Sequence, residues 1–225
     1  MQSENSRIWL VELRASRASL STYLVACLFF AYEATRDRLP TVAREVQTPL
    51  GPAAVQSIDD TQPIMNVPIL RAGLAFAEQV TSILPSARIF HLGMSRNEET
   101  LLPSIYLNKL PAKFPDGCHI FLMDPMLATG GTMAAAVNLI EDHGANIEQI
   151  TVTSAITCPP AIENLRQLFP GIRVYVAAVD HVLNEKRFMI PGLWRCWRPK
   201  LWDLANDLEL ERCSWAWAPG WLIQN

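Results

Sequence analysis

Short runs of apolar residues alternate along this chain with segments whose apolar residues recur at helical spacing. The apolar runs have the length of buried strands and cover residues 64–70, 87–92, 119–123, 147–156 and 172–179. Helical spacing predicts helices over residues 8–38, 74–83, 133–143 and 160–168. Because strands and helices follow one another in this way, the pattern predicts an α/β fold with a mainly parallel sheet flanked by helices on both faces.

Three segments depart from this alternation. Residues 39–63 are rich in Pro, Gly and Gln, which predicts an irregular connection. Residues 94–115 are polar and interrupted by prolines, and we expect a hairpin that acts as a flap, because long loops are usually functional or disordered. Residues 194–225 hold six of the seven tryptophans and sustain neither period. The sequence therefore predicts one domain over residues 1–193 and an aberrant, poorly packed tail after it.

The composition fits a single compact domain and excludes some classes of function. The chain has 225 residues, of which 50% are hydrophobic and 18% charged, and its formal net charge is −3. A chain of this size can bury one sizeable core. A negative net charge gives no electrostatic support for binding nucleic acid or an anionic membrane, so any phosphate must be held by a local site.

The N-terminus and the cysteines indicate in which cellular compartment the protein is expected. Residues 1–7 lack the basic start and apolar run of a signal peptide, and the apolar run Leu24–Tyr32 has about half the length of a spanning helix. The five cysteines are scattered without metal-ligand spacing, which predicts free thiols and no protein-bound metal. We therefore expect a cytoplasmic protein or, if the gene is organellar, a protein of an organelle stroma.

The segment from His119 to His143 carries the sharpest chemical signal. An apolar strand ends in Asp124, and a turn with Thr129, Gly130, Gly131 and Thr132 opens a helix. Glycines let the backbone approach an anion, while the first N–H groups of the helix and its dipole favour negative charge. We predict a sugar-phosphate site with the phosphate on the turn and the ribose hydroxyls on Asp124. An ordinary turn that uses glycine for its geometry remains the alternative.

Two arginines stand at similar places. Arg71 follows the strand that ends at Leu70, and Arg96 follows the strand that ends at Leu92. An arginine fork matches the oxygens of a pyrophosphate, although a solvated charge or an ion pair is the alternative for each. The histidines share no ligand spacing and are expected in structural or surface positions; they are His91, His119, His143 and His181.

Eight segments resemble, in order across about residues 12–193, the uracil phosphoribosyltransferases. They are residues 32–37, 47–50, 68–74, 96–100, 106–111, 124–132, 183–185 and 190–193. The most specific is Asp124-Pro-Met-Leu-Ala-Thr-Gly-Gly-Thr132. The resemblance implies the type I phosphoribosyltransferase fold and a pyrimidine-salvage transferase that converts uracil and 5-phospho-α-D-ribose 1-diphosphate to UMP and diphosphate. It also implies Mg²⁺ held through the diphosphate, a homo-oligomer and, in some members, allosteric binding of GTP.

The resemblance also implies roles for individual residues. Asp124, Arg71 and Arg96 would be the catalytic residues, and both arginines would hold the diphosphate. Met189 would contact uracil. The phosphoribosyl part of the donor would lie on Asp124, Pro125, Met126, Leu127, Ala128, Thr129, Gly130, Gly131 and Thr132.

The sequence departs from the family after Leu193. The family continues with Gly-Asp-Ala, whose backbone reads the uracil edge, whereas this chain has Trp194, Arg195 and Cys196. Arg187 also stands where the family commonly has glycine. As written, the base-binding positions are not matched, which leaves the activity of this chain open. The alternative function is a catalytically impaired homologue that binds the donor or UMP in a regulatory role.

A frameshift accounts for this tail. Tryptophan has one codon, which ends in GG, so dropping the first base at codon 194 places glycines opposite Trp194, Trp197 and Trp202. With permitted codons elsewhere, the shifted frame reads Gly-Asp-Ala-Gly-Asp-Arg-Asn-Phe-Gly-Thr and then a stop, which resembles the ending of the family. Our hypothesis is a one-base frameshift near codon 194, and the alternative is a divergent tail that binds a partner.

Overall fold

The computed structural model describes residues 32, 34–36, 38–97, 102–180, 182–184 and 189–190. Most of the predicted helix over 8–38 and all of the predicted tail lie outside these residues. The helices are α3 (Leu74–Ile83), α4 (Gly131–Asp142), α5 (Pro159–Leu168) and the 3-10 helix η1 (Ile147–Gln149). The strands are β1 (Thr41–Thr48), β2 (Gly51–Ile58), β3 (Ile64–Leu70), β4 (Arg88–Ile89), β5 (Leu92–Arg96), β6 (Pro103–Asn108), β7 (His119–Met123), β8 (Met126–Leu127), β9 (Ile150–Thr157), β10 (Arg173–Val179), β11 (Val182–Leu183) and β12 (Met189–Ile190).

The central sheet has the strand order β10-β9-β7-β3-β5-β6, with β4 beside β3 and β8 beside β9. Neighbouring strands along this order run parallel except β5 and β6, which form an antiparallel hairpin. The prediction of a mainly parallel α/β sheet is therefore confirmed. The main strands β3, β7 and β9 are almost wholly buried, which explains why β3 and β7 read as nearly continuous apolar runs, whereas the buried strand β9 also carries Thr and Ser.

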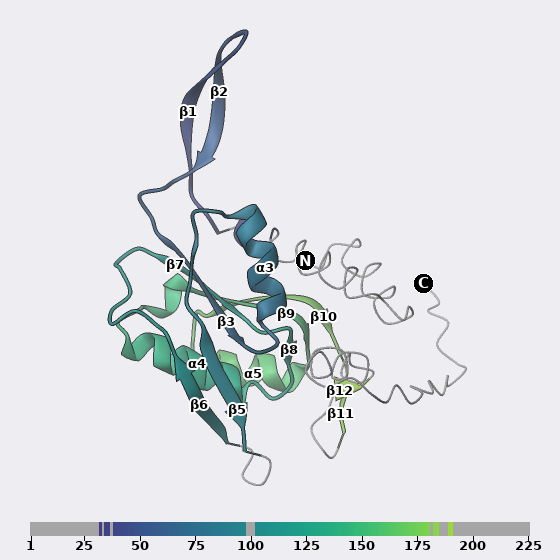
Figure 1. Ribbon diagram of the computed structural model, residues 1–225. Coiled ribbons are helices and arrows are strands. Elements are labelled where there is room, and N and C mark those ends of the chain that lie inside the picture. The colour runs from purple at the N-terminus through teal and green to yellow at the C-terminus, as the bar shows by residue number, and fades with distance from the viewer. Residues whose placement is uncertain are drawn as a thin grey trace, which may run out of the picture.

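The connections between the strands define a switch point in the sheet. The chain leaves β3 through α3 towards β5, but it leaves β7 through α4 towards β9 and continues through α5 to β10. Because such crossovers are right-handed, opposite directions put α3 on one face of the sheet and α4 and α5 on the other, as Figure 1 shows. The ligand crevice of a sheet of this kind lies beyond the carboxyl ends of the strands at the switch point, here β3 and β7.

The prediction of an irregular connection over residues 39–63 is wrong. Strands β1 and β2 pair antiparallel from Thr41–Ile58 to Thr48–Gly51 and form a hairpin that projects from the domain (Figure 1). No residue of either strand is buried. An exposed ribbon needs no alternation of buried apolar and solvated polar side chains, so the pattern that usually identifies a strand is missing.

Other boundaries shift by a few residues. The single strand predicted over 87–92 is wrong, because β4 and β5 are two short strands that pair with different parts of β3. The hairpin predicted within 94–115 is confirmed as the pair β5 and β6. Helix α4 begins at Gly131, two residues before its predicted start. Among the described helices, none has the length and apolar character needed to cross a membrane.

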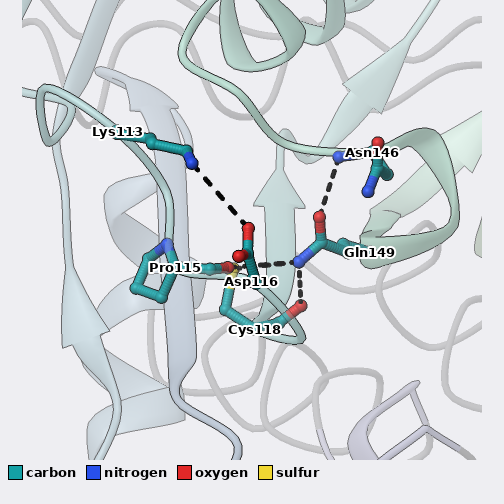
Figure 2. A network of polar contacts seen from close by, with 6 residues as sticks. All are labelled: Lys113, Pro115, Asp116, Cys118, Asn146 and Gln149. Carbon is teal, nitrogen blue, oxygen red and sulfur yellow. Dashed lines mark hydrogen bonds and ion pairs between the residues drawn. The ribbon is translucent and has the colours of Figure 1, made fainter.

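One glutamine side chain joins the starts of β7 and β9. Gln149 Nε2 donates hydrogen bonds to the carbonyl oxygens of Pro115 and Cys118, at 3.3 Å and 3.2 Å, and Gln149 Oε1 accepts one from the Asn146 N–H at 2.8 Å (Figure 2). Burial raises the pKa of the Cys118 thiol to about 11, so this free cysteine stays neutral. The amino ends of two neighbouring strands are thus fixed relative to each other, and their carboxyl ends carry the candidate site.

Candidate active site

Asp124 lies directly beyond the end of β7, at the switch point. Its own N–H donates to the Thr153 oxygen at 3.2 Å, and its Oδ1 accepts a long hydrogen bond of 3.5 Å from the Met126 N–H. Burial raises the pKa of the carboxyl to about 7, and the Met126 N–H opposes this shift. The residue is half-buried, so part of its surface stays accessible, and a carboxyl with one weak hydrogen bond retains acceptor capacity for a sugar hydroxyl.

The turn after Asp124 leads into the N-terminus of α4. Gly130 has a φ of 78°, in the left-handed region that favours glycine, and a Cβ there would lie 3.2 Å from the Ala161 oxygen. No described side chain caps this end of α4. The first N–H groups of the helix are therefore available to an anion.

The turn after β3 presses against the end of β7. A Cβ on Gly73 would lie 2.6 Å from the Met123 oxygen and 2.7 Å from the Ile69 backbone, so only glycine fits. The exposed residue Arg71 stands in this turn, and the peptide bond that precedes it is cis. Because Pro68 pairs with Met123, Arg71 and Asp124 follow the ends of adjacent strands, as the sequence predicts.

Arg96 reaches across to the glycine-rich turn. It ends β5, and its Nη2 donates to the Thr129 hydroxyl oxygen at 2.5 Å. A Cβ on Gly131 would lie 4.0 Å from the same guanidinium nitrogen. The structure therefore brings Arg96 to the turn predicted to hold the 5′-phosphate, and its predicted contact with the diphosphate stays a prediction.

The residues predicted for uracil are only partly described. Met189 is buried and pairs with Leu183 in the small β11–β12 ribbon. Trp194, Arg195 and Cys196 lie outside the described residues, as does Arg187. Sequence reasoning did not single out Asp180, a buried aspartate whose backbone N–H donates to the Thr157 oxygen at 2.7 Å. The signal that could have found it is its place directly after β10, since polar residues at strand ends line this edge of the sheet.

Two of the histidines have structural partners, as expected. His119 Nε2 lies 2.9 Å from Gln62 Oε1, and His143 Nδ1 donates to the Pro111 oxygen at 2.7 Å. Within the described part of the chain, no group of three His, Cys, Asp or Glu side chains could hold a metal ion.

Comparisons with known proteins place this architecture in a family. The profile described as Uracil phosphoribosyltransferase matches residues 12–194. The chain belongs to the uracil phosphoribosyltransferase family. The uracil phosphoribosyltransferase of Nicotiana tabacum is 54% identical over 162 residues, which cover 72% of each chain. The family match ends at the first residue of the predicted tail.

Two further uracil phosphoribosyltransferases are similar to this chain in sequence, and one solved structure is similar to it in fold. The chloroplastic enzyme of Arabidopsis thaliana is 54% identical over 162 residues, 72% of this chain, so this chain spans about half (55%) of that relative's length. The enzyme of Synechococcus elongatus is 45% identical over 165 residues, 73% of this chain and 76% of the relative. The structure of the AQ2163 protein from Aquifex aeolicus superposes with a TM-score of 0.74 at 32% identity, covering 86% of this chain and 92% of that one.

Proposed function

We propose that this chain transfers the phosphoribosyl group of 5-phospho-α-D-ribose 1-diphosphate to N1 of uracil, with release of UMP and diphosphate. The observation that carries the proposal is the segment 124–132 at the switch point, with the half-buried carboxyl of Asp124 at its start and the guanidinium of Arg96 on Thr129. Membership of the family supplies the two substrates.

The residues suit the charges that develop in this reaction. Breaking the bond between C1 and the diphosphate builds positive charge on the ribose and negative charge on the leaving oxygens. Arg71 and Arg96 would stabilise the leaving group, and Asp124 would hold the ribose hydroxyls as the ring gains cationic character. The step needs no covalent nucleophile, because orienting N1 of uracil towards C1 is mainly a matter of position. The β5–β6 hairpin would close over the site and exclude water.

We also propose that Mg²⁺ enters with the donor. Mg²⁺ at sites of this kind keeps several waters and binds mainly through substrate phosphates, so it needs no dedicated set of protein ligands. Because the described residues offer no cluster of ligands, the diphosphate oxygens would supply most of the coordination. When bound, the ion neutralises charge on the leaving group.

A homo-oligomer is part of the same proposal. The β1–β2 hairpin exposes Val46 and Val55, with 48% and 37% of their surface accessible, and Leu50 at its tip is fully exposed. An isolated two-stranded ribbon is marginally stable in water, so a second copy of the chain that covers it would stabilise it. A response to GTP rests on the family resemblance alone; turnover that is identical with and without GTP would end it.

The test is formation of UMP from labelled uracil by two proteins. One is the chain as printed, and the other replaces residues 194–225 by the Gly-Asp-Ala ending of the shifted frame. We expect turnover from the second and far less from the first, since unpaired hydrogen-bonding groups in a base pocket cost orders of magnitude in rate. No turnover by the second protein would sink the proposed function. Equal turnover by both would show instead that the tail over residues 194–225 does not impair the reaction.

A further inference from the structure

The glycine-rich turn and the two residues before it are held from behind by three side chains: Thr157 at the end of β9, Cys158 between β9 and α5, and Asn164 of α5. Thr157 Oγ1 donates to the Leu127 oxygen at 3.1 Å, and Cys158 Sγ donates to the Ala128 oxygen at 2.6 Å. Asn164 Nδ2 donates to the Thr129 oxygen at 3.2 Å. Three successive carbonyls of the turn are therefore each bound by a side chain that lies about thirty residues later in the sequence.

We propose that Thr157, Cys158 and Asn164 are positioning residues that aim the N–H groups of this turn at the 5′-phosphate of the donor. This inference rests on the proposed function and extends it to residues that do not touch the substrate. The class of ligand is a phosphate monoester, which the turn would hold through backbone donors.

The geometry of the peptide group carries the argument. In a trans peptide the carbonyl of one residue and the N–H of the next point in opposite directions, and Leu70–Arg71 is the cis bond recorded in the described chain. Binding the carbonyls of Leu127, Ala128 and Thr129 to β9 and α5 turns the N–H groups of residues 128–130 to the opposite side. Those groups continue into the uncapped first N–H groups of α4. Consecutive N–H groups that converge in this way form an anion-binding concavity.

Burial and packing support the same assignment. Thr157 and Cys158 are fully buried, so a lost partner could not be replaced by bulk water. Burial, assisted by the charge of Asp180, raises the pKa of the Cys158 thiol, which keeps its proton available for donation. Helix α5 also lies directly against Gly130, since a Cβ there would be 3.3 Å from Asn164 Nδ2. The turn has little room to rotate its carbonyls away.

The experiment measures binding separately for the two ends of the donor. Calorimetry with the full chain uses ribose 5-phosphate as a probe of the turn and inorganic diphosphate as a probe of the leaving-group side. In Asn164→Asp, a carboxylate faces the Thr129 oxygen; in Thr157→Val, the donor is lost at nearly constant shape. For each variant we expect ribose 5-phosphate to bind about tenfold more weakly while diphosphate binding is unchanged.

Conservative variants control for folding. Thr157→Ser and Cys158→Ser keep a donor at each place and should bind ribose 5-phosphate like the original chain. Gln167→Ala changes an exposed amide on the same helix that contacts Glu163, and it should also leave binding unchanged. In turnover assays with the restored ending, the donor's KM should rise while the KM for uracil stays the same.

The outcomes separate this inference from the proposed function. Unchanged ribose 5-phosphate binding in Asn164→Asp and Thr157→Val would overturn the inference, and so would equal losses for ribose 5-phosphate and diphosphate. If the original chain binds ribose 5-phosphate, the variants lose this binding, and the chain with the restored ending forms no UMP, the inference holds and the proposed transfer fails. A chain that binds no ribose 5-phosphate contradicts both.

Discussion

The glycine-rich turn and the β1–β2 hairpin differ in how much of the remaining chain touches them. The turn is bound by Arg96 from β5, by Thr157 from β9 and by Asn164 from α5. Strands β1 and β2 contact chiefly each other, and an exposed ion pair between Arg44 and Asp60 lies near the base of the hairpin. A segment fixed from several elements can hold one backbone conformation and a half-buried carboxyl, whereas a segment that fixes only itself remains available to a second molecule.

The largest effect should come from the half-buried carboxyl of Asp124 at the start of the turn. In Asp124→Asn, made in the chain with the restored ending, a neutral amide replaces the group that would hold the ribose as positive charge develops. We expect kcat/KM for the donor to fall about 10²- to 10³-fold, as is typical when one electrostatic contact of a transition state is removed. Steady-state assays of UMP formation measure this. A loss below about threefold would show that Asp124 does not contact the reacting sugar.

Two glycine substitutions distinguish a loss of folding stability from a loss of phosphate binding. Gly73→Ala would place a Cβ 2.6 Å from the Met123 oxygen, so we expect a loss of about 2–3 kcal/mol in the free energy of unfolding. Gly131→Ala finds only Thr129 Oγ1 at 3.8 Å and Arg96 Nη2 at 4.0 Å, and alanine is the better helix former. Its stability should therefore be unchanged or slightly higher.

The second glycine variant should nevertheless bind the donor poorly. The Cβ of Gly131→Ala would project towards the guanidinium of Arg96, into the space where the phosphate is expected. We expect the affinity for ribose 5-phosphate to fall about tenfold, because the backbone could no longer approach the anion closely. Urea unfolding and calorimetry on the two variants measure both quantities. If Gly131→Ala unfolds as readily as Gly73→Ala, Gly131 is required for stability, and the prediction that it serves phosphate binding alone is wrong.

The sequence predicted the turn but neither the hairpin nor the residues behind the turn, and the reasons are physical. A buried strand, Asp124 and two glycines before a helix form a local signal that is read within about fifteen residues. The hairpin β1–β2 exposes both faces and therefore lacks the alternation that marks a strand. Thr157 and Asn164 meet the turn only because β7 and β9 are neighbours in the sheet, which no local pattern records. Contacts between distant segments become visible only with the topology.

The proposed self-association through the β1–β2 hairpin can be tested on its own. Val46 and Val55 lie on one face of the ribbon, as the pairs Arg44–Val55 and Val46–Ala53 show. We expect Val46→Glu to weaken self-association about tenfold or more, since it buries a charge if a second copy covers this face. Gln47→Glu adds the same charge on the opposite face and is the matched control. Light scattering over a concentration series measures the self-association of both variants. If Val46→Glu and the original chain show the same mass distribution, this face of the hairpin is exposed to solvent and does not contact a second copy.

The smallest effect concerns what the half-buried carboxyl of Asp124 costs in stability. The pKa of Asp124 is raised from 3.8 to about 7 in the folded chain. Between these values the folded carboxyl keeps a proton that the unfolded one has lost, so this group lowers stability as pH rises from about 4 to about 7 and adds no further change above that. Asp124→Asn removes the titration, and its Tm should exceed that of the original chain by a few degrees at about pH 8 and by less at about pH 5. Thermal melts monitored by circular dichroism at several pH values measure the difference, with the exposed Asp116→Asn as control. If the melting temperatures of Asp124→Asn and the original chain stay equally far apart at every pH, the carboxyl is not held in a dry environment. In that case the turn would resemble the hairpin in its contact with water, and Asp124 would add little to donor binding beyond what the backbone donors of the turn and the two arginines supply.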